Sequence, residues 1–134
     1  MLNCKEFLKT IYFGDRFCTK VNIDCTNNKF ELHLNRISRI RDNNGNWNYY
    51  DKEDIENGII VINDIESVLF DDSGLIPNDQ IYAIYANEIN NDKYEIIIEA
   101  SNVDDSYNSN DIVIKIIGKS IHLKNPVNGL IIKD

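Results

Sequence analysis

The chain has 134 residues, 43% of them apolar, with a formal net charge of −8 and a pI near 4.7. This length fits a domain that buries about two thirds of its unfolded surface, so we expect residues 1–134 to form a single globular domain. The negative charge disfavours DNA and RNA as partners, because phosphate binding needs Lys and Arg to displace counterions. It favours a basic partner.

The first ten residues, MLNCKEFLKT, carry one acid and two lysines where a secretory signal needs a continuous apolar stretch. No apolar run is long enough to cross a bilayer, so we expect a cytoplasmic protein that does not enter the membrane. Cys4, Cys18 and Cys25 match neither a zinc motif nor a redox Cys-x-x-Cys motif, and idle thiols are expected. The abundance of Asn and Ile is typical of an AT-biased coding sequence and suggests a bacterial origin.

A helix is predicted near the start of the chain, from Asn3 to Phe13. Asn3 can cap the first turn, and Glu6 completes a capping box three residues later. The stripe expected on one face of this helix, which Gly14 ends, is Phe7, Leu8, Ile11 and Tyr12. We expect the helix to cover one face or end of a sheet.

From Cys18 onward, alternation of apolar and polar residues predicts strands. Asn27-Asn28 is expected to form a hairpin turn, and residues 42–46 a second one. Further strands are predicted at 59–62, 65–70, 81–89, 94–100, 112–117 and 121–123, the first two joined into one long strand that is kinked at Asn63-Asp64. This pattern predicts an α+β fold: a mainly antiparallel β-sheet, as a sandwich or a curled half-barrel, with one short N-terminal helix.

The segment ISRIRDNNGNWNYYDKEDIENGIIVI, residues 37–62, is the first candidate for a contact surface. It combines arginines, the only tryptophan, two adjacent tyrosines and five acidic residues, and protein interfaces concentrate Trp, Tyr and Arg. The predicted partner-binding residues, which include two acids outside this segment, are Trp47, Tyr49, Tyr50, Asp51, Glu53, Asp54, Asp71 and Asp72. Trp47 is as compatible with a core position as with a contact.

No catalytic constellation is visible, so we predict no enzyme, no cofactor and no metal site. His33 and His122 are the only histidines, and a triad would have to recruit one of them from a strand. The alternative is a small-ligand or enzymatic pocket in the curl of the sheet, with Glu31, His33, Arg39 and Arg41 as its polar groups.

Three blocks of the sequence resemble a family of small uncharacterised bacterial proteins, catalogued as a domain of unknown function. These blocks are FLKTIYFGDRFC, ISRIRDNNGNWNYYDKEDIENG and FDDSGLIPND. The family implies no activity, catalytic residue or cofactor. Small acidic bacterial proteins of this kind are similar in character to immunity proteins, which neutralise a toxin domain.

The resulting hypothesis is a protein-binding module of immunity type, whose acidic residues pair with a basic partner and whose aromatic rings bury against it. Two alternatives stay open. One is the ligand pocket, and the other is a self-associating structural protein, for which the apolar strands would supply the contact. The sequence does not fix the partner, the strand order or the oligomeric state.

Overall fold

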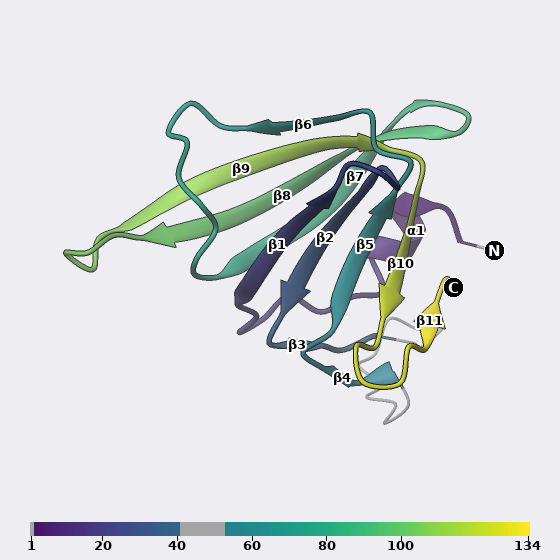
Figure 1. Ribbon diagram of the computed structural model, residues 1–134, viewed down its shortest axis with the longest axis horizontal. Helices are drawn as coiled ribbons and strands as arrows, with labels where there is room; N and C mark the ends of the chain where they lie inside the picture. The colour runs from purple at the N-terminus through teal and green to yellow at the C-terminus, as the bar shows by residue number, and fades with distance from the viewer. Residues whose placement is uncertain (1, 41–52) are drawn as a thin grey trace.

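The computed structural model describes residues 2–40 and 53–134 (Figure 1). In these two ranges one helix precedes eleven strands. The elements are α1 (Cys4–Leu8), β1 (Cys18–Asp24), β2 (Lys29–Leu34), β3 (Arg36–Ile37), β4 (Ile55–Glu56), β5 (Ile59–Asn63), β6 (Ser67–Phe70), β7 (Ile81–Asn90), β8 (Lys93–Val103), β9 (Ser109–Gly118), β10 (Ser120–Lys124) and β11 (Ile131–Ile132).

The strands form two larger sheets and one small one. The first sheet has the order β1-β2-β5-β10-β11, the second has the order β6-β9-β8-β7, and β3 pairs with β4 alone. Every strand pair described is antiparallel. Figure 1 shows the two larger sheets in two layers, with the long β8–β9 hairpin extending past the five-stranded sheet. The predicted α+β class and the mainly antiparallel architecture are confirmed.

The hydrophobic core fills the space between the two larger sheets. Alternation places the apolar side chains of each strand on the side facing the other sheet, which explains why Leu32 and Ile96 are fully buried. The side chains of the five-stranded sheet in this layer include Phe30, Leu32, Leu34, Ile60 and Ile62. Those of the four-stranded sheet include Ile84, Ile96, Ile98, Ile114 and Ile116. Burial of this kind stabilises a fold by about 1.5–3 kcal/mol for each large side chain.

The helix is shorter than predicted, although its start is correct. Asn3 caps it by accepting a hydrogen bond from the Glu6 amide at 2.9 Å, and its own amide group donates to the Glu6 carboxylate. After Leu8 the backbone leaves the helix and pairs with the segment after β3, where the Tyr12 amide donates to the Ser38 carbonyl. The predicted end at Phe13 was wrong because this tertiary pairing replaces the later helical hydrogen bonds. α1 packs against β7 and β10.

Residues 59–70 form two strands in different sheets and not one kinked strand. The chain turns at Asp64, whose φ of 52° lies in the left-handed region, so that β5 joins the five-stranded sheet and β6 joins the four-stranded sheet. The Asn27-Asn28 turn is confirmed, with Asn28 at a φ of 53° between β1 and β2. The strands predicted at 81–89, 94–100, 112–117 and 121–123 are present as β7 to β10, each longer than predicted. The turn predicted at 42–46 lies outside the described residues.

All three cysteines are free thiols. Cys4 is buried, and this burial raises the pKa of its thiol to about 11. A thiol that stays protonated is a poor nucleophile. That Cys4 packs in the core between α1 and the sheets fits the prediction of an idle thiol.

Candidate functional site

The predicted contact segment is described only at its two ends. Four of its predicted contact residues, Trp47, Tyr49, Tyr50 and Asp51, lie outside the described residues, as does Arg41. At the C-terminal end, the Asp54 carboxylate forms an ion pair with Arg36 at 2.7 Å and accepts a hydrogen bond from the Ser38 hydroxyl at 2.8 Å. Arg16 donates to the same hydroxyl at 2.9 Å. Asp54 therefore already joins β3 to the start of β4.

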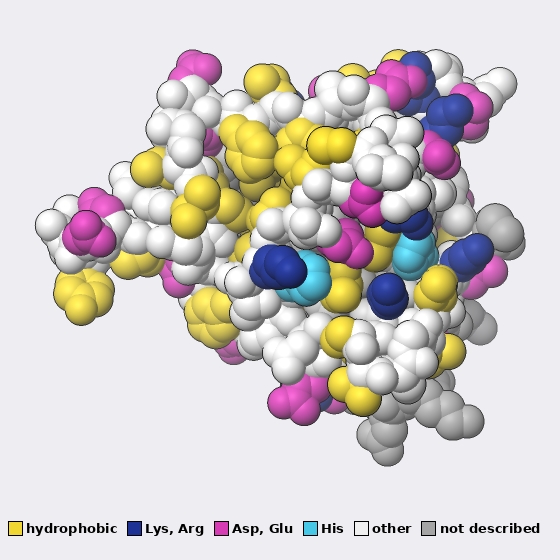
Figure 2. Space-filling view, in the orientation of Figure 1, with side chains coloured by type: hydrophobic (Ala, Val, Ile, Leu, Met, Phe, Trp, Pro, Cys, Tyr) yellow, Lys and Arg dark blue, Asp and Glu magenta, His cyan; other side chains and the backbone are white. Residues whose placement is uncertain are grey.

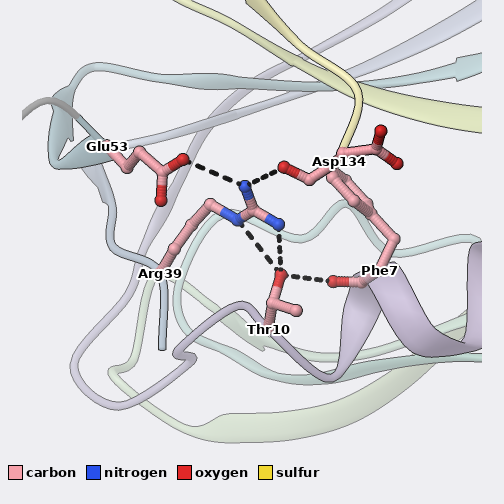
Figure 3. Close-up of polar contacts among 5 residues, drawn as sticks. All are labelled: Phe7, Thr10, Arg39, Glu53 and Asp134. Atoms are coloured by element: carbon pink, nitrogen blue, oxygen red, sulfur yellow. Dashed lines mark hydrogen bonds and ion pairs between the residues drawn. The ribbon is translucent and has the colours of Figure 1, made fainter. Parts of the chain in front are cut away.

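Arg39 is buried and fastens three distant parts of the chain together (Figure 3). Its guanidinium donates to the Thr10 hydroxyl at 3.1 and 2.8 Å and to the Asp134 carbonyl at 2.6 Å, and it pairs with Glu53 at 3.4 Å. It also lies 4.9 Å from the centre of the Phe7 ring, within the range of a cation–π contact. A buried cation needs such complete pairing, because its desolvation is costly. The arrangement gives Arg39 and Glu53 a structural role.

Glu31 and His33 lie on the outward face of the five-stranded sheet, away from the site of Arg39. Glu31 accepts a hydrogen bond from Asn22 at 2.7 Å, and its carboxylate is 4.0 Å from the His33 ring. Of the residues predicted to form the alternative pocket, Glu31 and His33 thus lie side by side, and Arg39 lies apart from them because it is bound to Thr10, Glu53 and Asp134.

The same outward face holds the second histidine. The register places Glu31 beside Val61 on β5, and Val61 beside His122 on β10. Figure 2 shows both imidazole rings on this side of the molecule, each next to cationic side chains. We call this surface the Lys/His face, and its charged and titratable members are Lys20, Asp24, Lys29, Glu31, His33, His122, Lys124 and Lys133.

Asn63 connects a lysine to a histidine on this face. Lys29 donates to the side-chain oxygen of Asn63 at 3.0 Å, which fixes the orientation of that amide. The amide nitrogen then faces the Nδ1 atom of His122 at 2.9 Å and the Ser120 hydroxyl at 3.2 Å. Since an amide nitrogen only donates, His122 Nδ1 accepts and the ring proton sits on Nε2. This ring is therefore held in one neutral tautomer.

Burial lowers the pKa of both histidines. For His122 the lysines at 29, 133 and 124 lower it further, and Glu31 opposes them. For His33 the carboxylate of Glu31 opposes the effect of burial, and Lys20 adds to it. Because both pKa values are lowered, both rings are neutral at physiological pH.

The sequence analysis treated the two histidines separately, because the strand order that puts β5 between β2 and β10 is not encoded in either local pattern.

A groove of about 710 Å³ opens beside His122, between the N-terminal segment and the edge of the Lys/His face. Besides His122, its polar lining includes Lys29, Lys119 and Lys133. Acidic side chains from two turns, Asp64 and Asp92, also border it. Within the described part of the chain, the His122 Nε2 atom makes no hydrogen bond and is open to the groove, whereas the Nε2 atom of His33 is buried without a hydrogen-bond partner.

The second surface lies at the end of the four-stranded sheet where β6 ends and the β8–β9 hairpin turns. Asp71, which follows β6, accepts a hydrogen bond from the Val113 amide of β9, so the β6 end lies against the β8–β9 hairpin. The pairing of Ser101 with Asp111 places the rest of the hairpin beyond this point. We call this region the acidic end, and its carboxylates are Asp71, Asp72, Asp104, Asp105 and Asp111. Sequence reasoning named only the first two as contacts.

Two of these carboxylates hold turns. Asp71 accepts hydrogen bonds from the amide and hydroxyl of Ser73, and Asp104 accepts from the amides of Ser106 and Asn108. The side-chain hydrogen bond from Ser73 lowers the pKa of Asp71, and the backbone hydrogen bond from Asn108 lowers that of Asp104. Both carboxylates are therefore charged and fixed in position well below neutral pH.

Tyr107 stands at the tip of the hairpin. Its side chain is 89% exposed, the second most exposed of the large apolar side chains described. Its φ of 62° lies in the left-handed region, which costs a tyrosine about 1–2 kcal/mol. Its amide donates to the Asp104 carbonyl at 3.0 Å, which closes the tip. An aromatic ring is thus presented to solvent among carboxylates.

The fold and the family of this chain are both shown. The fold is an α+β arrangement of antiparallel sheets. A family model covers residues 1–131, and the chain belongs to that family, described as a family of unknown function (DUF6258). The predicted resemblance is confirmed, and it extends beyond the three blocks that suggested it. No curated protein and no solved structure matches the chain.

Two further findings concern the described residues only. No helix in ranges 2–40 and 53–134 is long and apolar enough to cross a membrane. Within the same ranges, no group of three or more His, Cys, Asp or Glu side chains is placed to hold a metal ion.

Proposed function

We propose that this chain is a protein-binding module of immunity type, which neutralises a bacterial toxin domain by binding a basic surface on it. The observation that carries the proposal is the acidic end, where two separate segments of the chain, residues 71–72 and 104–111, contribute five carboxylates and an exposed tyrosine. Family membership is compatible with this role but assigns no activity.

Charge supports a basic partner at the acidic end. The sequence contains no Lys or Arg from residue 53 to residue 92, and none from residue 94 to residue 114. The segments that carry Asp72, Asp105 and Asp111 therefore contain no cationic residue. On the side shown in Figure 2, the hairpin end carries acidic and apolar side chains without a dark blue cation. A surface charge of one sign steers a partner of opposite charge and accelerates association.

Apolar contact would supply the remaining affinity. In addition to Tyr107, the acidic end has two exposed apolar residues: Ile76, with an exposed fraction of 63%, and Phe70, with an exposed fraction of 37%. Aromatic side chains surrounded by charged ones are typical of the residues that dominate binding energy. A partner that covers Tyr107 and Phe70 would exclude water from the ion pairs around them, which strengthens those pairs.

The acidic end is also held in position before any partner binds. The side chain of Asn78 accepts a hydrogen bond from the Val103 amide at 2.8 Å and donates to the Val103 carbonyl at 3.1 Å. Asn102 donates to the Ile76 carbonyl at 2.9 Å. The loop after β6 is thus fastened to the hairpin, and less entropy is lost on binding than for a free loop.

The experiment is co-expression of this chain with the product of the gene immediately upstream. We expect the two proteins to co-purify, and we expect the chain to restore growth to cells that this product poisons. Replacement of Asp105 by lysine should weaken both effects, whereas the matched replacement Glu88→Lys, on β7, should leave them unchanged. Equal loss in the two variants, or full rescue by both, would show that the acidic end is not the contact.

The predicted contact residues of the segment 37–62 belong to the same test. If Asp105→Lys retains binding, the triple substitution of Trp47, Tyr49 and Tyr50 by alanine should abolish it, since that segment is then the contact. Failure of both variants to reduce co-purification would remove the proposal for either surface.

A further inference from the structure

We propose that the groove beside His122 is a binding site for a phosphate-type dianion, formed by the His122 ring and the lysines at positions 29 and 133. This site goes beyond the proposed function, because it lies on the five-stranded sheet and not at the acidic end. Three features of the groove support it: a ring N–H group of His122 that has no hydrogen-bond partner in the described residues, a fixed orientation of that ring, and an excess of cations over carboxylates in the lining.

The unpaired donor is the Nε2–H group of His122. The residue is only 7% exposed, and its Nδ1 atom is occupied by Asn63. The opposite ring nitrogen makes no hydrogen bond within the described ranges, and the ring lines the groove. This N–H group is open to the groove, so an acceptor oxygen of a ligand can take the place of water on it.

The orientation is fixed by neighbours on two other strands. Lys29 on β2 holds the Asn63 oxygen, and Asn63 on β5 holds the His122 ring on β10. The Lys29 ammonium uses one of its three hydrogens in this contact and keeps two for a ligand. Protonation of Nδ1 would place two donors against each other, so the ring keeps its Nε2–H form at neutral pH. The site is thus organised before the ligand arrives.

The local charge suits an anion. The charged side chains that line the groove are Lys29, Lys119 and Lys133 against Asp64 and Asp92. Three cations against two carboxylates leave a formal charge of +1, in a chain whose total is −8. Phosphate and its monoesters carry close to two negative charges at neutral pH and offer several acceptor oxygens. The groove volume of about 710 Å³ leaves room for more than a phosphate group, which favours a monoester.

The test is titration of the full chain with inorganic phosphate, sulfate and phenyl phosphate at pH 7.5 and constant ionic strength. Binding is followed by the nitrogen and proton resonances of the His122 ring, which also report the tautomer. We expect saturable shifts of the Nε2–H resonance with each dianion, and tighter binding of phenyl phosphate if the apolar lining is used. Acetate should bind more weakly.

Single substitutions separate a site from general charge screening. Lys29→Met and Lys133→Met should each weaken dianion binding about fivefold or more. Lys115→Met removes the same charge from the outer face of the other sheet and should change affinity less than twofold. Lys133 follows the last strand and is exposed, so its replacement leaves the fold intact.

Two results would overturn the proposal. One is a linear, unsaturated response of the His122 ring to all three dianions. The other is an equal loss of affinity in the three lysine variants, which would mean that the anions respond only to net charge. Neither result bears on rescue from a toxin, so the two proposals fail independently.

Discussion

The Lys/His face and the acidic end differ both in charge and in what lies beneath them. The Lys/His face lies directly over the core, since its strands β2, β5 and β10 bury Phe30, Ile62 and Leu123 on their other side. The acidic end extends past the five-stranded sheet, and turn hydrogen bonds hold it in place of core packing. Changes below the face should cost stability, and changes at the acidic end should cost binding.

The net charge of a chain does not predict the charge of each of its surfaces. A total of −8 predicted a basic partner, and the acidic end is the surface at which we propose that this partner binds. Yet four lysines and both histidines gather on one sheet face, among them Lys20, Lys29 and His122. The same chain therefore offers surfaces suited to ligands of opposite sign.

The largest expected effect is at the core below the Lys/His face. Phe30 is fully buried near the start of β2, and Phe30→Ala should lower the free energy of unfolding by about 3–5 kcal/mol through lost burial and the cavity left behind. Tyr107→Ala at the acidic end should change it by less than about 0.5 kcal/mol. Denaturant unfolding of both variants checks the contrast. Comparable losses would mean that the hairpin tip is part of the cooperative core.

The two regions should also respond to acid in different pH windows. The pKa of His33 and of His122 is lowered in the folded state, so the unfolded chain binds more protons just below pH 6.5. Stability is then complete above about pH 6.5 and falls as the pH drops, by at most about 1.4 kcal/mol per pH unit for each histidine. Chemical denaturation between pH 5 and pH 8 measures this slope, which should be reduced in His122→Gln.

The carboxylates of the acidic end titrate at a lower pH than the histidines. The pKa values of Asp71 and Asp104 lie below their ordinary value of 3.8, so their contribution is present above that value and is lost as the pH falls further. The predicted stability profile therefore has two descending regions. A single descent near pH 4, with no change between pH 5 and pH 7, would show that the histidines are not linked to folding.

Local patterns in the sequence predicted the elements well and their partners poorly. Alternation of apolar and polar residues predicted strand where β2 lies, and the apolar members Phe30, Leu32 and Leu34 are buried, because the period of a strand is a local property. The end of α1 and the crossing at Asp64 depend on which distant segments pair, and no pattern within ten residues encodes that choice. Strands β3, β4 and β11 were missed because they are two residues long.

The make-up of the candidate surfaces also depends on which distant segments pair, which local sequence patterns do not predict. Asp71 and Asp72 were predicted contacts because they are acidic and adjacent, but Asp104, Asp105 and Asp111 join them only through the pairing of β6 with β9. Glu53 and Asp54 were predicted contacts too, and within the chain they pair with Arg39 and Arg36. Distance along the chain does not distinguish a free carboxylate from a committed one.

A smaller effect is expected where the loop after β6 meets the hairpin. Asn78→Ala removes both hydrogen bonds to Val103 at an exposed position and should cost about 1 kcal/mol. Hydrogen exchange should show faster exchange of the Val103 amide, while amides of the Lys/His face keep their protection. The matched control is Asn91→Ala in the β7–β8 turn, which should leave the Val103 amide unchanged. Unchanged exchange in Asn78→Ala would contradict the idea that this contact organises the acidic end.

The smallest expected change separates stability from binding at a single residue. Tyr107 occupies the left-handed region, so Tyr107→Gly relieves strain of about 1–2 kcal/mol and adds about 0.5–1 kcal/mol of chain entropy to the unfolded state. The net result should be a gain in stability of about 0.5 kcal/mol, measured by thermal unfolding, with weaker co-purification with the basic partner. Tyr107→Phe should keep both properties near those of the original chain. Unchanged co-purification of Tyr107→Gly with the basic partner would show that Tyr107 is not an apolar anchor of the acidic end.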